Sequence, residues 1–433
     1  MNYYLAIDLG ATSGRHVVAH KEKNEIVLEE IYRFKTGMDD TKDGLVWNIP
    51  LFFEEIKKGI KIAFEKYRNI ISLSIDTWGV DYVLMNGDKE IPPFYAYRNA
   101  RNLSSCDLVD EIIPFRELYR HTGIQFATFN TIYQLYDDLQ KGRLDNATDY
   151  LMLPSYFTYK LTGVKTHEYT DESTGALLNI ETNDYDFEII DKLGLPRKLF
   201  TEIKHPGYVI GDLLPEIQKE VGGNCKVVLC PSHDTASAFE AVDLPEKSIL
   251  ISSGTWSLLG VKNKDAIVTD KSRIANYTNE GGVGYYRFLK NIMGMWIANS
   301  LRDETGLPFH YIDNGLRFSK YKNTFDVNDP SLTAPKDMRM AIYYLLRNNP
   351  PKDTIDMFAS IYQSMAICYR KSIEELENIT GEKYLNIYIV GGGAKNKYLN
   401  KLVAKETGKN VKALPIEATS MGNIKTQMEA FKE

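Results

Sequence analysis

Residues 5–18 read LAIDLGATSGRHVV, an apolar strand, a turn of small residues and a second apolar strand. Gly10 and Gly14 allow left-handed backbone or a close approach to another group. Successive backbone N–H groups in such a turn form a concave anion site, to which nearby hydroxyls and Arg15 contribute. Asp8 ends the first strand, where a carboxylate holds Mg²⁺ beside bound phosphates, directly or through water. A plain β-hairpin explains the same pattern, whereas a P-loop does not, because GATSGR lacks the Gly-Lys-Ser/Thr ending.

Composition indicates a globular protein of more than one domain. At 433 residues the chain exceeds what one hydrophobic core usually supports, so two domains are expected. Hydrophobic residues make up 43% and charged residues 25%, which is typical of soluble proteins. A net charge of −6 gives no reason to expect nucleic acid or a membrane surface as partner. Four cysteines without CxxC spacing, and no apolar segment of bilayer length, favour a soluble cytoplasmic protein.

A second strand, turn and strand is predicted at residues 73–85, LSIDTWGVDYVLM. Its bend holds Asp76, Trp78, Gly79 and Asp81. Buried Asp and Trp side chains are usually structural, each satisfied by local hydrogen bonds. A binding role for this bend is the alternative.

Residues 95–190 are less periodic and indicate an insertion on the first domain. The α/β pattern then resumes with a strand at residues 225–231, CKVVLCP, and a helix that begins in residues 232–242, SHDTASAFEAV. Asp234 therefore lies at the carboxyl end of a strand and the N-terminus of a helix. It is either a helix cap, worth ~1 kcal/mol, or a general base at the ligand-binding edge of the sheet. The spacing does not choose between these roles.

The second half repeats the opening pattern. Residues 247–261, KSILISSGTWSLLGV, predict a strand, a turn of small residues that includes Thr255, and another strand. This similarity indicates a distant internal repeat. Two anion-binding turns at matching places predict a phosphate held from both sides, which favours a nucleotide over a plain hairpin.

Four segments follow in the second half. Residues 279–299, NEGGVGYYRFLKNIMGMWIAN, predict a Gly-rich loop leading into a helix, and residues 323–353 a surface excursion. Residues 355–379 carry the clearest amphipathic helix, closed by Gly381. Residues 385–408, LNIYIVGGGAKNKYLNKLVAKETG, predict a strand, three glycines and a helix. The glycines leave room for a flat ligand, although close packing of strand and helix explains them too.

Ten motifs run nearly end to end along the chain: DLGATSGR, SIDTWGVDYVL, YRNAR, TGIQFATFNTIYQL, SHDTASA, SSGTWSL, TNEGG, LKNIMGMW, VGGGAKN and EATSMGNI. In this order they resemble the sugar kinases of the actin-like ATPase superfamily (FGGY carbohydrate kinases), and most closely the rhamnulokinases. The resemblance implies two RNase H-like α/β domains with ATP and sugar in the cleft between them. Residues 1–243 would bind sugar and phosphate and carry the insertion at about 95–190, and residues 244–433 would bind the nucleotide.

The resemblance also implies a reaction and the residues that perform it. With ATP and Mg²⁺, such an enzyme phosphorylates the 1-hydroxyl of L-rhamnulose to L-rhamnulose 1-phosphate, as a monomer or small homo-oligomer. Asp234 matches the catalytic base and Asp8 the metal position. The substrate positions are Gly79, His233, Asp234, Thr235 and Asn291. The nucleotide positions are Ala11, Thr12, Ser13, Gly14, Arg15, Thr255, Asn299 and Gly393.

Two departures from the family pattern predict a weaker nucleotide contact. Asn299 stands where related enzymes often have Gln, so its amide reaches less far. The chain also ends sooner than is usual for these kinases.

Three other functions keep part of the pattern. A kinase for another ketose or deoxy sugar, such as L-fuculose or xylulose, keeps every catalytic part, and only a sugar panel separates it. An actin-like ATPase that acts as a switch or polymer keeps both turns but has no need of SHDTASA, and it would turn over ATP without sugar. A sugar-binding protein keeps the cleft but would not bind ATP.

Overall fold

The computed structural model describes residues 1–23, 25–414 and 417–432. The chain forms two compact units, each discontinuous in sequence. Unit 1 consists of Met1–Val242, Lys262–Phe288 and Ala418–Glu433, and unit 2 consists of Asp243–Val261 and Leu289–Glu417. Two segments of the second half, residues 262–288 and 418–433, therefore belong to unit 1. The division into residues 1–243 and 244–433 stays a prediction.

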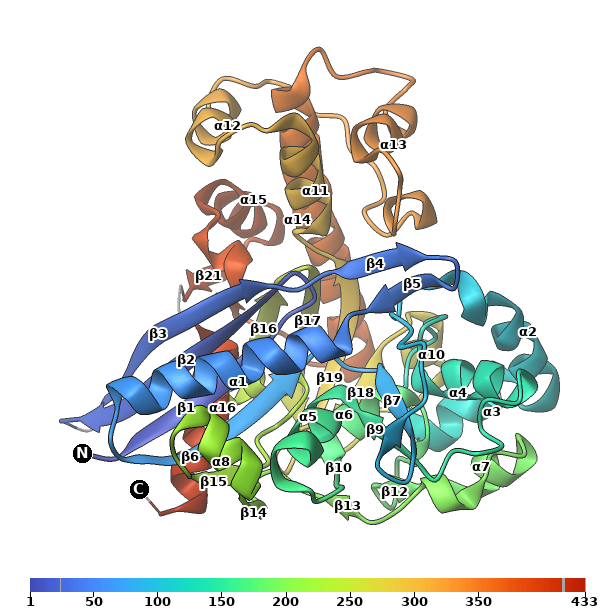
Figure 1. The fold of residues 1–433 in the computed structure, drawn as a ribbon. Helices are drawn as coiled ribbons and strands as arrows, with labels where there is room; N and C mark the ends of the chain where they lie inside the picture. Colours follow the sequence, from blue (N-terminus) through green and yellow to red (C-terminus); the bar gives the residue numbers. More distant parts are fainter. Residues whose placement is uncertain (24, 415–416, 433) are drawn as a thin grey trace. The chain divides into compact units, whose positions relative to one another are not determined.

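A six-stranded sheet with the order β14-β15-β6-β1-β2-β3 forms the centre of unit 1 (Figure 1). Its strands are β1 (Tyr3–Leu9), β2 (Ser13–Glu22), β3 (Glu25–Lys35), β6 (Ile70–Thr77), β14 (Val209–Asp212) and β15 (Lys226–Val228). β1 and β2 pair antiparallel, which confirms the hairpin predicted at residues 5–18, whereas β1 and β6 are parallel. The carboxyl ends of β1 and β6 therefore lie side by side.

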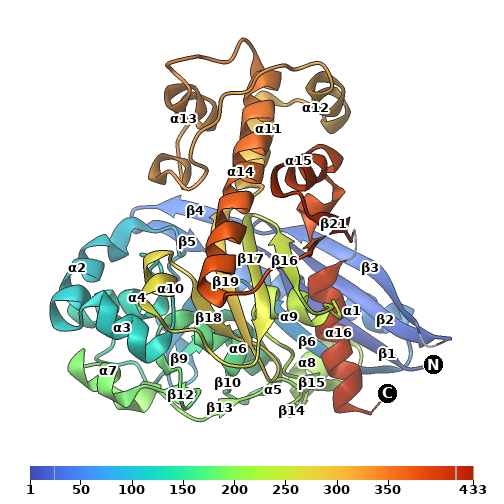
Figure 2. The same ribbon diagram turned by 180° about the vertical axis from the view of Figure 1, so that it is seen from behind.

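Helices cover both faces of this sheet. Successive side chains of a strand point to opposite faces, so buried strands need a covering layer on each face. α1 (Ile49–Lys66) packs on one face. α16 (Ala418–Ala430) packs on the other, where Ile424 is buried against Tyr4 of β1. Figure 2 shows α16 beside α9 (Asp234–Glu240). The chain's last helix thus completes the core of the unit that holds its first strand.

The rest of unit 1 consists of short strands and helices. The strands are β4 (Met38–Thr41), β5 (Gly44–Trp47), β7 (Tyr82–Asn86), β8 (Lys89–Glu90), β9 (Asp149–Met152), β10 (His167–Glu168), β11 (Leu178–Asn179), β12 (Asp184–Tyr185) and β13 (Ile203–Lys204). The helices are α2 (Leu103–Ile112), α3 (Phe115–Thr122), α4 (Thr131–Gln140), α5 (Leu153–Thr162), α6 (Tyr169–Glu172), α7 (Phe187–Lys192), α8 (Pro215–Val221) and α10 (Asp270–Ile274). Residues 95–190 lie within unit 1 and supply much of a separate hydrophobic core.

A second six-stranded sheet has the order β18-β19-β17-β16-β20-β21. Its strands are β16 (Ser248–Ser253), β17 (Trp256–Asn263), β18 (Thr278–Gly281), β19 (Tyr286–Met293), β20 (Asn386–Val390) and β21 (Asn410–Ala413). β17 and β19 each run from one unit into the other. β16 pairs antiparallel with β17 and parallel with β20, the same arrangement that β1 has with β2 and β6. The pairing confirms the predicted internal repeat.

Helices of unit 2 gather around one long helix (Figure 2). They are α11 (Trp296–Thr305), α12 (Phe309–Leu316), α13 (Met338–Leu345), α14 (Thr354–Thr380) and α15 (Lys397–Thr407). α14 confirms the amphipathic helix predicted at residues 355–379, and Gly381 ends it in the left-handed conformation with φ 72°. α15 packs beside α14.

One predicted segment of the second half was wrong. Residues 279–299 were expected as a Gly-rich loop leading into a helix, but they form strands β18 and β19 before α11 begins. Gly281 ends β18, and Gly282 N closes the turn that follows by donating to Tyr285 O at 2.9 Å. Residues 323–353 are mostly exposed, as a surface excursion should be, and they contain α13. No helix in the described part of the chain is long and apolar enough to cross a membrane.

Candidate active site

Two carboxylates and a guanidinium meet at the carboxyl ends of β1 and β6. Asp8 and Asp76 are register partners on these parallel strands. Arg15 lies opposite Asp8 on β2 and donates from Nε to Asp8 Oδ2 at 2.8 Å. Asp8 is 4% exposed and Asp76 is fully buried. This edge of an α/β sheet is where ligands usually bind.

Asp76 has one carboxylate oxygen without a partner. Its Oδ2 accepts a hydrogen bond from Asn423 Nδ2 of α16 at 2.5 Å, while the buried Oδ1 has no hydrogen-bond partner among the described residues. Burial and the charge of Asp8 raise the pKa of Asp76 well above its usual value. A cation beside the two carboxylates would relieve their repulsion. The sequence indicated only Asp8 as the metal position.

The predicted anion-binding turn is closed by its own backbone. Gly10 N donates to Ser13 O at 3.0 Å. Thr36, which follows β3, donates from Oγ1 to Gly10 O at 2.6 Å and from N to Thr12 O at 3.3 Å. Ala11 is half-buried and Thr12 is exposed, so the tip of the turn is open to a ligand.

Gly14 has a packing reason besides the phosphate contact that the family resemblance implies. Neither Gly10 nor Gly14 has a positive φ. A Cβ on Gly14 would lie 2.3 Å from Cζ of Phe34 on β3. Packing between neighbouring strands therefore requires a glycine at this position.

Asp81 and Trp78 are structural, as the sequence favoured. Asp81 Oδ2 accepts hydrogen bonds from Trp47 Nε1 at 2.6 Å, Trp78 Nε1 at 2.9 Å and Tyr97 N at 3.1 Å. Burial raises the pKa of Asp81 to about 6, against the opposing effect of these hydrogen bonds. Its Oδ1 accepts from Gln134 Nε2 at 3.1 Å, so both oxygens of this carboxylate tie the bend to neighbouring segments.

Gly79 lies where the bend touches the segment after α6. A Cβ on Gly79 would lie 2.8 Å from Thr174 Oγ1. The same hydroxyl accepts a hydrogen bond from Val80 N at 3.2 Å. Glycine at this position therefore has a packing reason besides the substrate contact implied by the family.

Glu168 holds the loop that carries the predicted catalytic residues. Its buried carboxylate accepts from Ser232 N at 3.0 Å and from Thr170 N at 2.9 Å. Thr77 N, at the end of β6, donates to Ser232 O at 2.9 Å. The loop before α9 is thus fixed both to α6 and to the strand that ends beside Asp8. The sequence did not single out Glu168, since its motif resembles an ordinary helix start.

Asp234 is the first residue of α9, and not its N-cap. The N-cap is His233, whose side chain makes no capping hydrogen bond. The Asp234 side chain is 32% exposed, and its Oδ1 lies 3.5 Å from His233 Nε2. Thr235, otherwise buried, donates from Oγ1 to Asp234 Oδ1 at 3.0 Å. Burial raises the pKa of Asp234, which His233 partly offsets and the charge of Asp8 reinforces.

Two charged residues that the sequence did not single out face His233. Arg287 on β19 is fully buried, with Nη1 3.0 Å from His233 Nδ1. Glu280 on β18 lies beside both. The available signal was an arginine next to the apolar residues Phe288 and Leu289 of the strand YRFLKNIM, where a buried charge requires partners.

Asp171 of α6 is a further buried carboxyl close to this loop. Neither of its side-chain oxygens has a hydrogen-bond partner among the described residues. Burial and the nearby carboxylates, Asp234 among them, raise its pKa well above the usual value. The predicted base Asp234 therefore lies near several buried polar groups of unit 1, which the periodicity of the sequence did not reveal.

In unit 2 the turn between β16 and β17 binds the start of α11. Thr255 O accepts from Gly294 N at 3.1 Å and from Trp296 N at 3.2 Å. A Cβ on Gly294 would lie 2.5 Å from the carbonyl carbon of Trp256, so this approach needs glycine. Asn299 lies on α11 and is half-buried. Thr255 and Asn299, two predicted nucleotide residues, thus belong to one strand–turn–helix arrangement.

Asn291 of β19 offers an unsatisfied polar atom in unit 2. The residue is half-buried, and its Oδ1 is buried without a hydrogen-bond partner in the described structure. A ligand hydroxyl or amine at this point would satisfy it.

The three glycines after β20 have two different roles. A Cβ on Gly391 would lie 2.9 Å from Ser253 O, and one on Gly393 would lie 2.0 Å from Ser253 Oγ. Gly391 also has φ 78°. Gly392 is exposed, with no atom within 4 Å of its Cβ position. Packing explains the outer glycines, and room for a ligand remains at Gly392.

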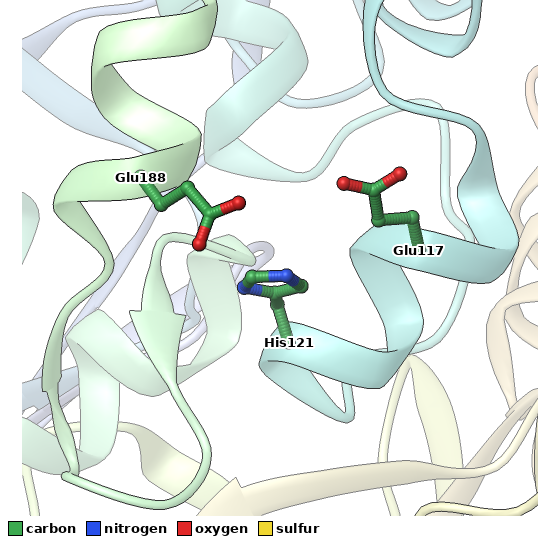
Figure 3. Close-up of side chains that lie close together, drawn as sticks. All are labelled: Glu117, His121 and Glu188. Carbon is green, nitrogen blue, oxygen red and sulfur yellow. The ribbon is translucent and has the colours of Figure 1, made fainter.

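A cluster of possible metal ligands lies elsewhere in unit 1. Glu117 and His121 of α3 and Glu188 of α7 have ligand atoms within 4.8 Å of one another (Figure 3). Lys192 Nζ lies 2.8 Å from Glu117 Oε1 and 3.0 Å from Glu188 Oε1. Lys192 already forms ion pairs with both carboxylates, so the cluster is an ion-pair network between two helices.

Comparison with known families identifies the class of protein. The family model for the N-terminal domain of the FGGY family of carbohydrate kinases matches residues 3–239, and the model for the C-terminal domain matches residues 249–431. The chain therefore belongs to the FGGY family of carbohydrate kinases and is a sugar kinase, for which the family implies ATP as phosphoryl donor.

Known relatives agree with this assignment over nearly their whole lengths. A rhamnulokinase from Oceanobacillus iheyensis is 39% identical over 438 residues, which cover 99% of this chain and 93% of the relative. A rhamnulokinase from Bacillus subtilis is 36% identical, over 99% of this chain and 90% of the relative.

Solved structures confirm the predicted two-domain α/β fold. A xylulose kinase from Lactobacillus acidophilus has a TM-score of 0.82 at 16% identity, covering 100% of this chain and 90% of that protein. A Plasmodium falciparum glycerol kinase with ADP has a TM-score of 0.76 at 15% identity, and the match covers 100% of this chain and 90% of the glycerol kinase.

Proposed function

We propose that this sugar kinase transfers the γ-phosphoryl group of ATP to the 1-hydroxyl of L-rhamnulose, giving L-rhamnulose 1-phosphate and ADP. The full-length similarity to rhamnulokinases supports this choice of sugar. One structural observation supports the chemistry most strongly. Asp234 is partly exposed, has a raised pKa and lies at the carboxyl end of the sheet, near Asp8.

Asp234 acts as general base on the sugar hydroxyl. A raised carboxyl pKa makes the ionised carboxylate a stronger proton acceptor. Thr235 keeps Asp234 Oδ1 in place through its hydrogen bond at 3.0 Å. Phosphoryl transfer needs alignment and charge stabilisation more than covalent help, so one base on a fixed loop is sufficient.

Asp8 and Asp76 fit a Mg²⁺ site. Mg²⁺ prefers oxygen ligands and keeps several waters, and Asp76 Oδ1 is an oxygen without a partner. When bound, the metal ion neutralises charge on the transferring phosphoryl group. Arg15 holds Asp8 in position, and the open tip at Ala11 and Thr12 is available to phosphate oxygens.

The nucleotide residues divide between the units in the same way as the sequence repeat. Residues 11–15 lie in unit 1, and Thr255, Asn299 and Gly393 lie in unit 2. Of the sugar residues, Gly79, His233 and Thr235 lie in unit 1, and Asn291 lies in unit 2. We therefore propose that both units contribute to each substrate site, in a cleft that closes during the reaction.

A coupled ADP-release assay across a panel of acceptors tests the proposal. We expect L-rhamnulose to give the highest kcat/KM, with L-fuculose weaker and D-xylulose and glycerol weaker still. A higher kcat/KM for any of these three would overturn the choice of substrate and favour a kinase for that acceptor. ADP release that does not depend on sugar would favour an ATPase.

A further inference from the structure

Arg287 is a buried cation, and each of its three side-chain nitrogens contacts a neighbouring group. Its Nε donates to Gly281 O at 2.7 Å, and its Nη2 lies 3.4 Å from Thr170 O. Its Nη1 lies 3.0 Å from His233 Nδ1 and 3.0 Å from Glu280 Oε2. The side chain is completely buried, so these contacts replace water.

The contact between Arg287 and His233 determines where the imidazole carries its proton. A guanidinium has only N–H donors, so His233 Nδ1 must accept the hydrogen bond from Nη1. A neutral imidazole that accepts at Nδ1 carries its proton at Nε2. That Nε2 lies 3.5 Å from Asp234 Oδ1.

Glu280 offers an alternative partner for the imidazole, and the geometry disfavours it. His233 Nδ1 lies 3.4 Å from Glu280 Oε2, which would suit a protonated Nδ1. A proton there would point two N–H groups at each other across the 3.0 Å contact with Arg287. Among the described residues, Glu280 Oε2 lies 3.0 Å from Arg287 Nη1 and has no aligned hydrogen-bond donor. Burial would raise the pKa of Glu280, but the charge of Arg287 acts against this and the pKa is lowered overall, so Glu280 is the counter-ion of Arg287.

We propose that Arg287 is a positioning residue that locks His233 in the Nε2–H tautomer and so places a hydrogen-bond donor beside the acceptor Asp234. This inference rests on the proposed function of Asp234 as base. A donor and an acceptor 3.5 Å apart match two neighbouring oxygens of one sugar. Asp234 takes the proton of the reacting hydroxyl, and His233 donates to the oxygen on the adjacent carbon. A 1-hydroxyl next to the C2 oxygen of a ketose provides this pair.

The tautomer is measured directly by NMR of the full chain labelled with ¹⁵N-histidine, in the absence of any substrate. The chain has seven histidines, so the His233 signals are assigned from their loss in His233→Gln. We expect the shifts of a neutral imidazole with a proton on Nε2 only. A proton on Nδ1, alone or together with Nε2, would overturn the proposal. Because no catalysis is involved, this outcome is independent of which sugar the enzyme phosphorylates.

Variants link the tautomer to sugar binding. Removing Arg287 alone would leave Glu280 as an unpaired buried charge, so the test uses Arg287→Met with Glu280→Met, which removes both charges. We expect His233 to lose its single tautomer and the KM for sugar to rise about tenfold, the equivalent of one hydrogen bond, with ATP affinity unchanged. Arg287→Lys keeps a donor-only cation and should restore much of the parental tautomer and KM. A folded double variant with parental tautomer and KM would refute the role of Arg287.

Discussion

At the scale of single residues, Gly392 allows a test of why three glycines follow β20: to leave room for a ligand, or to let strand and helix pack closely. Gly391 and Gly393 are held against Ser253 by packing, whereas the Cβ position of Gly392 is open. A substitution at Gly392 therefore tests for a ligand without disturbing the fold.

We expect Gly392→Ala to change the free energy of unfolding by less than ~0.5 kcal/mol, because the new methyl group meets no atom within 4 Å. If the nucleotide lies against this turn, the same methyl group weakens ATP binding, which calorimetry measures. Gly393→Ala is the control, and it should lose stability by ~1–3 kcal/mol because its Cβ would lie 2.0 Å from Ser253 Oγ. Parental ATP affinity in Gly392→Ala would remove the turn from the nucleotide site.

Other residues show why the sequence revealed only part of the site. Asp8 and Asp234 were singled out from local patterns, because Asp8 lies near the end of an apolar strand before a turn and Asp234 follows an apolar strand. Asp76 also lies in a strand, but the hydrogen bond to its Oδ2 comes from Asn423, 347 positions away along the chain. Arg287 and Glu168 were missed for the same reason, since their partners come from distant segments.

At the scale of elements, patterns carried by one continuous segment were predicted correctly. The two hairpins, α14 and the strand–glycine–helix after residue 385 have hydrophobic periodicity that does not depend on other segments. β18 and β19 were mistaken for a loop, because three glycines and a buried arginine mask the alternation of a strand. The packing of the closing helix α16 against β1 was not predicted.

The contact between α16 and α9 gives a prediction at this scale. A Cβ on Gly422 of α16 would lie 1.8 Å from Ser237 O of α9, and backbone atoms cannot move aside as a flexible side chain does. We expect Gly422→Ala to lower the free energy of unfolding by ~1–3 kcal/mol or more, measured by denaturant titration.

Thr419→Ala, at a half-buried position of the same helix, is the control and should change stability little. Because α16 also carries Asn423, the partner of Asp76, Gly422→Ala should reduce kinase activity as well. Parental stability in Gly422→Ala would mean that α16 and α9 pack differently from the contact described.

At the scale of the whole molecule, the repeat in the sequence corresponds to two sheets with the same strand pairing. The sequence indicated this division but not the return of residues 262–288 and 418–433 to unit 1. A chain that crosses between units several times cannot be divided by composition alone, because no segment has a composition that shows which unit it belongs to.

Closure of the two units around the substrates is the expected motion. Sugar and nucleotide residues are proposed in both units, so the transferring phosphoryl group requires that they meet. Small-angle scattering should give a smaller radius of gyration with sugar and a non-hydrolysable ATP analogue together than with either alone. Equal dimensions in all four ligand states would contradict a closing cleft.

Asp234→Asn is the measurement that bears most directly on the catalytic assignment. The variant keeps an oxygen that can accept from Thr235 Oγ1 and begins a helix whose N-cap is another residue, so its thermal stability and ATP affinity should match the parent. It removes the proton acceptor, and loss of a general base typically lowers the rate by ~10²–10⁴. With the best acceptor of the sugar panel, we predict that kcat falls by this factor. A kcat close to the parent's would show that Asp234 is not the base.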